Sequence, residues 1–292
     1  MQVFFLYATA VLIWGSTWIA ITFQLGSVAE EISVAYRFGF ASIALFAYAA
    51  VTGRRTRIPL ESYGQVVLMG VLMYSSSYMI LYHATSYVTS GLIAVIFSLI
   101  VVSNAFFERI FFRKPLEKRM MAASVLGLSG IAMLFWREVS SFDFQDQTIM
   151  GIALATTAVV IASLGNMAAI VNTERELPLV AVNAHAMAWG GASSLLVALL
   201  MGRSLSFSFE PAYVLSLIYL AVFGSAVAFG AYLALIRLIG SARAAYTAVL
   251  FPIVALGIST FVEGYQWSAP AVGGVAAIIA GNWLALTKIA KE

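Results

Sequence analysis

Long apolar runs are the feature that most constrains how this chain can fold. Runs such as Ala269–Leu286 carry no charge and are long enough, as helices, to cross a hydrocarbon core about 30 Å thick. In such a core only helices and closed barrels satisfy their backbone hydrogen bonds, and these runs lack the alternation of barrel strands. Composition agrees, because 10% of the 292 residues are charged, against about 25% in soluble domains. We therefore predict an all-α membrane protein.

Placing helices on these runs predicts ten transmembrane spans, at residues 2–24, 32–52, 64–84, 88–107, 120–137, 148–172, 179–201, 212–236, 243–262 and 268–287. The 16 Lys and Arg residues cluster in the loops at one end of these spans, with Arg37, Arg137 and Arg203 as the exceptions. By the positive-inside rule, both termini are expected in the cytoplasm. The predicted location is the cell inner (plasma) membrane, as a multi-pass protein.

The two halves of the chain can be aligned with each other. Residues 35–54 match residues 184–203, and both segments end in Gly-Arg; residues 91–108 match residues 246–263, and both end in Glu. Because five spans per half is an odd number, the second copy is expected to be inverted in the membrane. We expect one repeat at 1–140 and the other at 141–292, with solute bound between them. Two fused halves favour a monomer.

Several classes of site are excluded or disfavoured by composition. The chain has no cysteine, which excludes disulfides, thiolate metal sites and cysteine nucleophiles, and its two histidines alone cannot make a zinc site. We expect no metal and no cofactor. A membrane-embedded enzyme would need a nucleophile with a base, or a carboxylate–histidine cluster. His83 is expected near the outer end of its span and His185 in the outer part of its span, with no carboxylate beside either in sequence, so an enzyme is the less favoured hypothesis.

Arg37 is the ionisable residue predicted to lie deepest in the membrane, near the outer end of the second span. Its guanidinium could form a gate or contact a substrate anion. Alternatively, it could snorkel to the interface or pair with Glu30 or Glu31. His83 and His185 could likewise bind substrate or make an interhelical hydrogen bond.

Aromatic and hydroxyl side chains recur on the third predicted span. Tyr74, Tyr78 and Tyr82 are four residues apart and would share one helix face with Ser75. Pro252 removes a backbone N–H in the ninth span and leaves a polar spot. The predicted cavity residues are Trp14, Trp18, Tyr74, Ser75, Tyr78, Tyr82, His83, His185, Tyr232, Tyr246 and Pro252. The alternative is an aromatic-rich helix interface or an interfacial belt.

A set of short motifs resembles the drug/metabolite transporter superfamily, in its ten-helix EamA-type branch. In chain order the motifs are Trp14-Gly15-Ser16, Arg37-Phe38, the Gly-Leu-Ile-Ala segment from Gly91 with Glu108 after it, Leu126-Gly127 with Gly130, and Gly240-Ser241-Ala242-Arg243-Ala244 leading to Pro252 and Glu263. Two features depart from the pattern: Phe97-Ser98 stands where many relatives place a proline, and Phe111-Phe112 is unusual.

The resemblance implies alternating access between two inverted five-helix halves, with a cavity built by helices other than the fifth and tenth. Within the branch the chain is similar to the YddG-type exporters of aromatic amino acids. The expected partners are a small-molecule substrate and the lipid bilayer, with no nucleic acid. The expected function is export or facilitated diffusion of small amphipathic metabolites, foremost aromatic and other neutral amino acids. Export of drugs or of nucleotide-like solutes is the alternative.

Overall fold

The described part of the chain consists of helices joined by short loops. The structure, a computed structural model, describes residues 1–88, 93, 96–136, 146–262 and 267–286. Within these ranges no strand is present. The helices are α1 (Gln2–Thr22), α2 (Glu30–Val51), α3 (Leu60–Val71), α4 (Ser77–Ala84), α6 (Ile100–Phe112), α7 (Lys118–Leu134), α9 (Asp146–Glu174), α10 (Leu179–Leu200), α11 (Pro211–Tyr219), α12 (Ala228–Ile239), α13 (Ser241–Ala244), α14 (Thr247–Val262) and α15 (Ala269–Leu286).

Two of the long helices contain a π-helical segment in the middle. The segment η1 (Leu72–Ser76) joins α3 to α4, and η2 (Leu220–Val227) joins α11 to α12. A π turn bonds each N–H to the carbonyl five residues back, so it inserts an extra residue and rotates the side chains beyond it. Such turns occur often at functional sites, and here both segments lie beside the central cavity described below.

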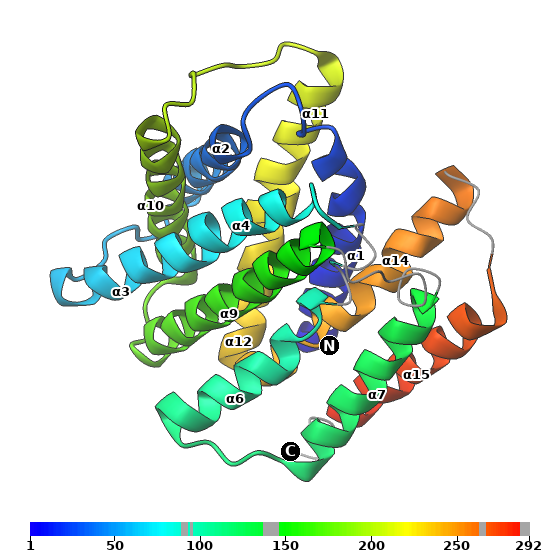
Figure 1. The fold of residues 1–292 in the computed structure, drawn as a ribbon. Helices are drawn as coiled ribbons and strands as arrows, with labels where there is room; N and C mark the ends of the chain where they lie inside the picture. The colour runs from blue at the N-terminus through cyan, green and yellow to red at the C-terminus, as the bar shows by residue number, and fades with distance from the viewer. Residues whose placement is uncertain (89–92, 94–95, 137–145, 263–266, 287–292) are drawn as a thin grey trace.

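The helices α7 and α15 pack against each other at one edge of the molecule (Figure 1), and glycine residues allow their close approach. A Cβ atom added at Gly274 would lie 2.5 Å from the Gly130 carbonyl oxygen, and one added at Gly281 would lie 2.9 Å from the Ala123 carbonyl oxygen. The backbones can approach this closely only because these positions lack a side chain. A second close pair joins α2 to α10 on the other side of the molecule (Figure 1).

Many large apolar side chains face outward, as a lipid environment requires. Leu200 is 79% exposed and Trp283 is 67% exposed, although both belong to long helices. In water such a surface would be unfavourable, whereas acyl chains solvate it. The exposed surface therefore agrees with the prediction of a membrane protein.

Seven helices within the described ranges are long and apolar enough to cross a membrane: Gln2–Thr22, Glu30–Val51, Leu60–Ala84, Gln147–Glu174, Pro211–Ile239, Ser241–Ile258 and Ala269–Leu286. The predicted spans 88–107, 120–137 and 179–201 contain helices in their described parts but do not meet that standard. The first is described as helix α6 only from Ile100, and the second has 17 residues in α7. The third is one continuous 22-residue helix, α10, whose polar residues, Asn183 and His185 among them, lower its mean hydropathy.

One predicted helix boundary is wrong. The span predicted to end at residue 107 continues to Phe112, with the charged Glu108 and Arg109 in the last turns of the helix. The span predicted at 243–262 contains a two-residue turn at Ala245 and Tyr246, between α13 and α14, although Ser241–Ile258 still counts among the seven helices above.

Candidate functional site

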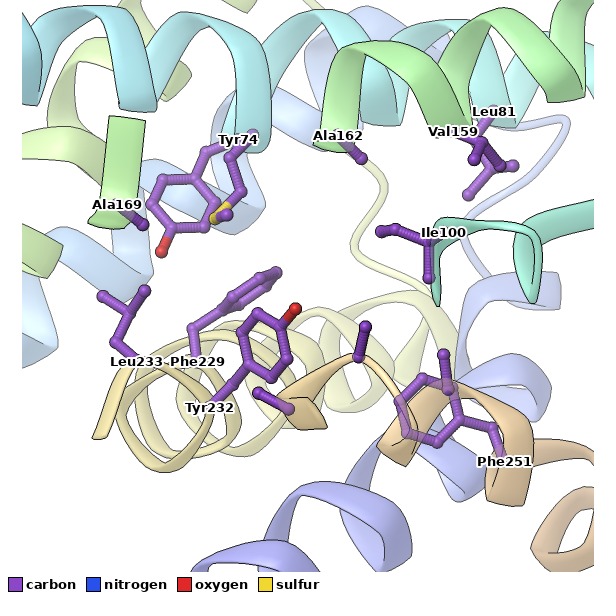
Figure 2. Packing of buried hydrophobic residues seen from close by; sticks show 14 of the residues in the cluster. Tyr74, Leu81, Ile100, Val159, Ala162, Ala169, Phe229, Tyr232, Leu233 and Phe251 are labelled. Atoms are coloured by element: carbon purple, nitrogen blue, oxygen red, sulfur yellow. The ribbon is translucent and has the colours of Figure 1, made fainter. Parts of the chain in front are cut away.

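A cavity lies in the interior, between α1, α2, α4, α9, α12 and α14. Figure 2 shows part of its wall, where Phe229, Tyr232 and Phe251 project from α12 and α14 toward Ile100 and Ala162. The lining residues are Trp14, Thr17, Ile21, Arg37, Met73, Ser77, Tyr78, Leu81, Phe97, Ile100, Ala162, Asn166, Phe229, Tyr232, Ala245, Thr247, Ala248 and Phe251. Neither α7 nor α15 contributes to this set. The lining is mostly apolar, with a few polar groups that could orient a solute.

Trp14 is the centre of an aromatic cluster on one wall. Its ring centroid lies 4.8 Å from that of Phe229, 5.2 Å from that of Tyr232 and 5.4 Å from that of Phe251, and all three contacts are edge-to-face. The Trp14 indole N–H donates to the Gly224 carbonyl oxygen in η2, at 2.9 Å. The hydrogen bond fixes the ring, so the cluster presents a rigid surface suited to a flat apolar group.

Arg37 is the charged group of the lining. It is 2% exposed, its Nε donates to Ser225 Oγ at 3.0 Å, and an Nη atom lies 3.5 Å from the Tyr82 hydroxyl oxygen. Its guanidinium carbon lies 4.8 Å from the centroid of the Tyr78 ring. These partners are neutral, and no described carboxylate pairs with it. A buried cation held only by dipoles and ring faces retains a strong affinity for an anion.

The ion-pair alternative for Arg37 is contradicted by the position of Glu31. This carboxylate is 1% exposed, and its oxygens lie 2.9 Å from His83 Nε2 and 3.6 Å from Arg203 Nε. Glu31 is therefore already paired with other side chains, and no ion pair joins Arg37 to Glu30 or to Glu31. The arginine points inward because Ser225 and the tyrosine rings provide the contacts that water would otherwise supply.

The structure places four of the predicted site residues in the cavity lining: Trp14, Arg37, Tyr78 and Tyr232. The side chain of Trp18 lies outside the described part of the chain, as do Gly91 and Glu263 of the sequence motifs.

The π segment η1 interrupts the predicted tyrosine face on the third span. Tyr74 lies within η1 and donates to Asn183 Oδ1 on α10 at 2.6 Å. Ser75 accepts a hydrogen bond from Ser194, also on α10. Only Tyr78 lines the cavity, while Tyr82 reaches it indirectly through Arg37. The i, i+4, i+8 argument assumed an uninterrupted α-helix, which the extra π residue breaks.

His83 does not line the cavity. No carboxylate lies beside it in the sequence, as expected, but one lies beside it in the folded protein. It contacts Glu31, which is 52 residues away along the chain. Glu30, Glu31 and His83 offer ligand atoms within 4.8 Å of one another, a spacing that could hold a metal ion. Arg203 beside Glu31 opposes a second cation there, so the arrangement is explained as an ion-pair cluster tying α2, α4 and the loop after α10 together.

His185 lies at the other end of its helix from the end predicted. Its Nε2 is 2.9 Å from the Thr56 carbonyl oxygen and its Nδ1 is 3.2 Å from the Tyr63 hydroxyl oxygen. Thr56 belongs to the basic loop between α2 and α3, so the histidine lies near that end, about 10 Å into α10 at 1.5 Å per residue. Both ring nitrogens of His185 therefore have a polar partner, and the side chain does not line the cavity.

Tyr246 and Pro252 also lie outside the lining. The Tyr246 hydroxyl donates to the Met120 carbonyl oxygen at 2.9 Å and joins α7 to the α13–α14 junction. Pro252 is buried inside α14, and its missing N–H leaves the carbonyl of Ala248 without its helical partner. Ala248, one turn before the proline, does line the cavity.

Several lining residues were missed by the sequence analysis, notably Asn166, Thr247, Phe229 and Phe251. Asn166 could have been found, because an amide in the middle of an apolar run is expensive in lipid, as a charge is. The phenylalanines carry no such signal, since an apolar ring is as stable facing lipid as it is facing the cavity.

Comparison with known proteins agrees with this architecture. The profile of the EamA-like transporter family matches residues 1–136 and 149–287. The inner membrane transporter YedA of Escherichia coli (strain K12) is 26% identical over 256 residues, which are 87% of this chain and 80% of YedA. Protein PagO of Salmonella typhimurium (strain LT2) is 20% identical over 288 residues, 96% of this chain and 91% of PagO. A solved protein structure with 17% identity superposes with a TM-score of 0.82 over 98% of this chain and 97% of its own.

The family profile covers nearly the whole chain, and the apolar helices and internal cavity are those of a membrane protein that passes a solute. The chain is a multi-pass inner-membrane transporter, and it belongs to the EamA-like transporter family.

Proposed function

We propose that the protein exports, or facilitates the diffusion of, small amphipathic metabolites that carry a carboxylate, foremost aromatic and other neutral amino acids. The observation that carries this proposal is Arg37, a buried guanidinium without a described carboxylate partner in a cavity walled by aromatic rings. A guanidinium binds a carboxylate through two parallel hydrogen bonds, and the Trp14 cluster offers a surface for a ring or other apolar group.

The proposed architecture is ten spans in two inverted five-helix repeats, 1–140 and 141–292, working as a monomer by alternating access with both termini in the cytoplasm. Three observations support the repeat. The third helix of each half contains a π segment, η1 in one and η2 in the other. The second helices of the halves, α2 and α10, pair with each other, as do the fifth helices, α7 and α15. The family profile matches each half.

The charge of the lining argues against the other solutes considered. A cationic drug would need an anionic group, yet the described lining contains Arg37 and no carboxylate. A nucleotide-like solute, with its several negative charges, would need several cations there. The solute is proposed to cross unchanged, so the protein is not an enzyme.

The test is an efflux screen in proteoliposomes. Vesicles containing the purified protein are loaded with labelled phenylalanine, tryptophan, threonine, uridine monophosphate or ethidium, and efflux is compared with protein-free vesicles. We expect protein-dependent efflux of the two aromatic amino acids, weaker efflux of threonine, and none of the last two solutes. Efflux of ethidium or uridine monophosphate without any amino-acid efflux would refute the proposal.

A further inference from the structure

A buried cluster of amides and hydroxyls lies where α6, α9 and α13 meet. Asn104 on α6 is fully buried, and its Oδ1 accepts hydrogen bonds from Ser163 Oγ at 2.6 Å and from Asn166 Nδ2 at 3.2 Å. Its own Nδ2 donates to the Ser241 carbonyl oxygen, at 3.4 Å. Tyr232 adjoins the same two amides. The central asparagine thus has its donor and its acceptor engaged.

These contacts fix which way Asn166 is turned. Because Asn104 directs its NH2 group at a carbonyl, its oxygen must be the atom that faces Asn166, and Asn166 must direct its NH2 group at that oxygen. The Oδ1 atom of Asn166 is then left over, and it has no hydrogen-bond partner among the described residues. The side chain is 1% exposed, so this is a buried acceptor without a donor, which is unfavourable in the empty state.

Asn166 lines the same cavity as Arg37. Among the described residues, the cavity therefore contains two polar groups with bonding capacity to spare: a cation without a carboxylate partner, and an acceptor without a donor. A solute that satisfies both must carry an anionic group such as a carboxylate and a hydrogen-bond donor, which can be an N–H, an N⁺–H or an O–H. An α-amino acid carries an ammonium and a carboxylate on the same carbon atom, Cα, and its side chain is then free to contact the aromatic wall.

We propose that Asn166 Oδ1 accepts a hydrogen bond from the ammonium group of the substrate, and so makes the cavity selective for amino acids over other carboxylates. The inference rests on the proposed function, because it assumes that the carboxylate binds Arg37. It assigns to Asn104 a positioning role, which is to hold the Asn166 amide with its oxygen free.

The same helix offers a matched control. Asn172 is also buried on α9. Within the part of the chain that the structure describes, its Oδ1 has no hydrogen-bond partner and its Nδ2 bonds to the Met69 sulfur at 3.6 Å. It does not line the cavity. Asn172→Leu therefore makes the same chemical change in the same helix, away from the proposed site.

The test measures binding to the purified full-length protein in detergent, by titration with phenylalanine and with 3-phenylpropionate, which lacks the ammonium group. For Asn166→Leu we expect the Kd of phenylalanine to rise about tenfold or more, as loss of a hydrogen bond to a charged group predicts, with the Kd of 3-phenylpropionate unchanged. Asn172→Leu should bind both as the wild type does. Should Asn166→Leu not fold, Asn166→Asp replaces it; a carboxylate acceptor should preserve or increase the preference for phenylalanine.

The outcomes separate the two proposals. If the wild type binds neither compound, the proposed function is wrong, and this inference with it. If the wild type binds both compounds, but Asn166→Leu raises both Kd values equally or changes neither, the proposed function stands and the role of Asn166 is refuted. The role is also refuted if Asn166→Asp loses the preference for phenylalanine, or if Asn172→Leu changes it as much as Asn166→Leu does.

Discussion

At the scale of single residues, the cavity combines a buried cation with a rigid aromatic wall. The described partners of Arg37 are a serine hydroxyl, a tyrosine hydroxyl and two ring faces, so burying its charge costs stability. Such a cost is tolerated where the group has a function. We therefore assign the charge to the proposed site and not to the stability of the fold.

Substitution of Arg37 should therefore affect transport more than it affects stability. Arg37→Gln should reduce the rate of phenylalanine transport at least about tenfold, because the carboxylate loses its charged, two-pronged partner. The Tm in detergent should stay the same or rise, because a buried charge is removed. Arg37→Lys should be intermediate, since an ammonium cannot keep the bond to Ser225 and bind a carboxylate in two-pronged fashion at once. Transport by Arg37→Gln at the wild-type rate would show that the guanidinium does not bind the solute.

At the scale of helices, the pair that packs through glycine is not among the helices that line the cavity. The pair α7 and α15 depends on glycine for its close approach and does not line the cavity, whereas the helices with π segments supply Ser225, Gly224 and Tyr78 to the site or its supports. The Gly224 carbonyl oxygen, which lies in the π segment η2, accepts the hydrogen bond that holds Trp14. The irregular backbone is thus placed where it orients the aromatic wall.

Alanine substitutions at two glycines test this separation. Gly274→Ala puts a Cβ atom 2.5 Å from the Gly130 carbonyl oxygen, so we expect a loss of about 1–3 kcal/mol in stability and a lower Tm in detergent. Gly257→Ala, in α14, meets nothing within 4 Å, and should raise the Tm because alanine favours helix by up to about 1 kcal/mol. Equal Tm values for the two variants would mean that the α7–α15 contact is not tightly packed.

Much of the fold was predictable at this scale, and less of the site was. Apolar runs located the helices because hydrophobic length is a one-dimensional property of the chain, and ends such as Ala84 were correct. The π turns carry no comparable signal, so Tyr74 was placed in the cavity and lies instead against Asn183. The pairing of His83 with Glu31 joins residues far apart in sequence, and only tertiary packing determines it.

At the scale of the whole molecule, the central proposal is an inverted pair of five-helix halves enclosing one solute site. In such a pair each half contributes equivalent helices from opposite directions, so a change in tilt of one half against the other can open the site to either side. The cavity lining draws on both halves, with Trp14, Arg37 and Tyr78 from the first and Asn166, Tyr232 and Phe251 from the second.

The absence of cysteine makes the orientation directly measurable. Single cysteines introduced at two exposed loop residues, as Arg57→Cys and Ser204→Cys, can be labelled in intact cells with a maleimide that does not cross membranes. The positive-inside rule predicts labelling at position 204 only, with position 57 labelled after the cells are opened. Labelling of position 57 in intact cells would reverse the proposed topology, and labelling of both would refute the fixed orientation.

The central claim is that a carboxylate-bearing amphipathic solute crosses the membrane through the cavity at Arg37. Counterflow tests it most directly: proteoliposomes preloaded with unlabelled phenylalanine are diluted into labelled phenylalanine, and internal label is followed with time. The account predicts a transient accumulation of label with the wild-type protein and little or none with Arg37→Gln. It would be contradicted if wild-type vesicles gained no more label than protein-free vesicles, or if the Arg37→Gln protein accumulated label as fast as the wild type.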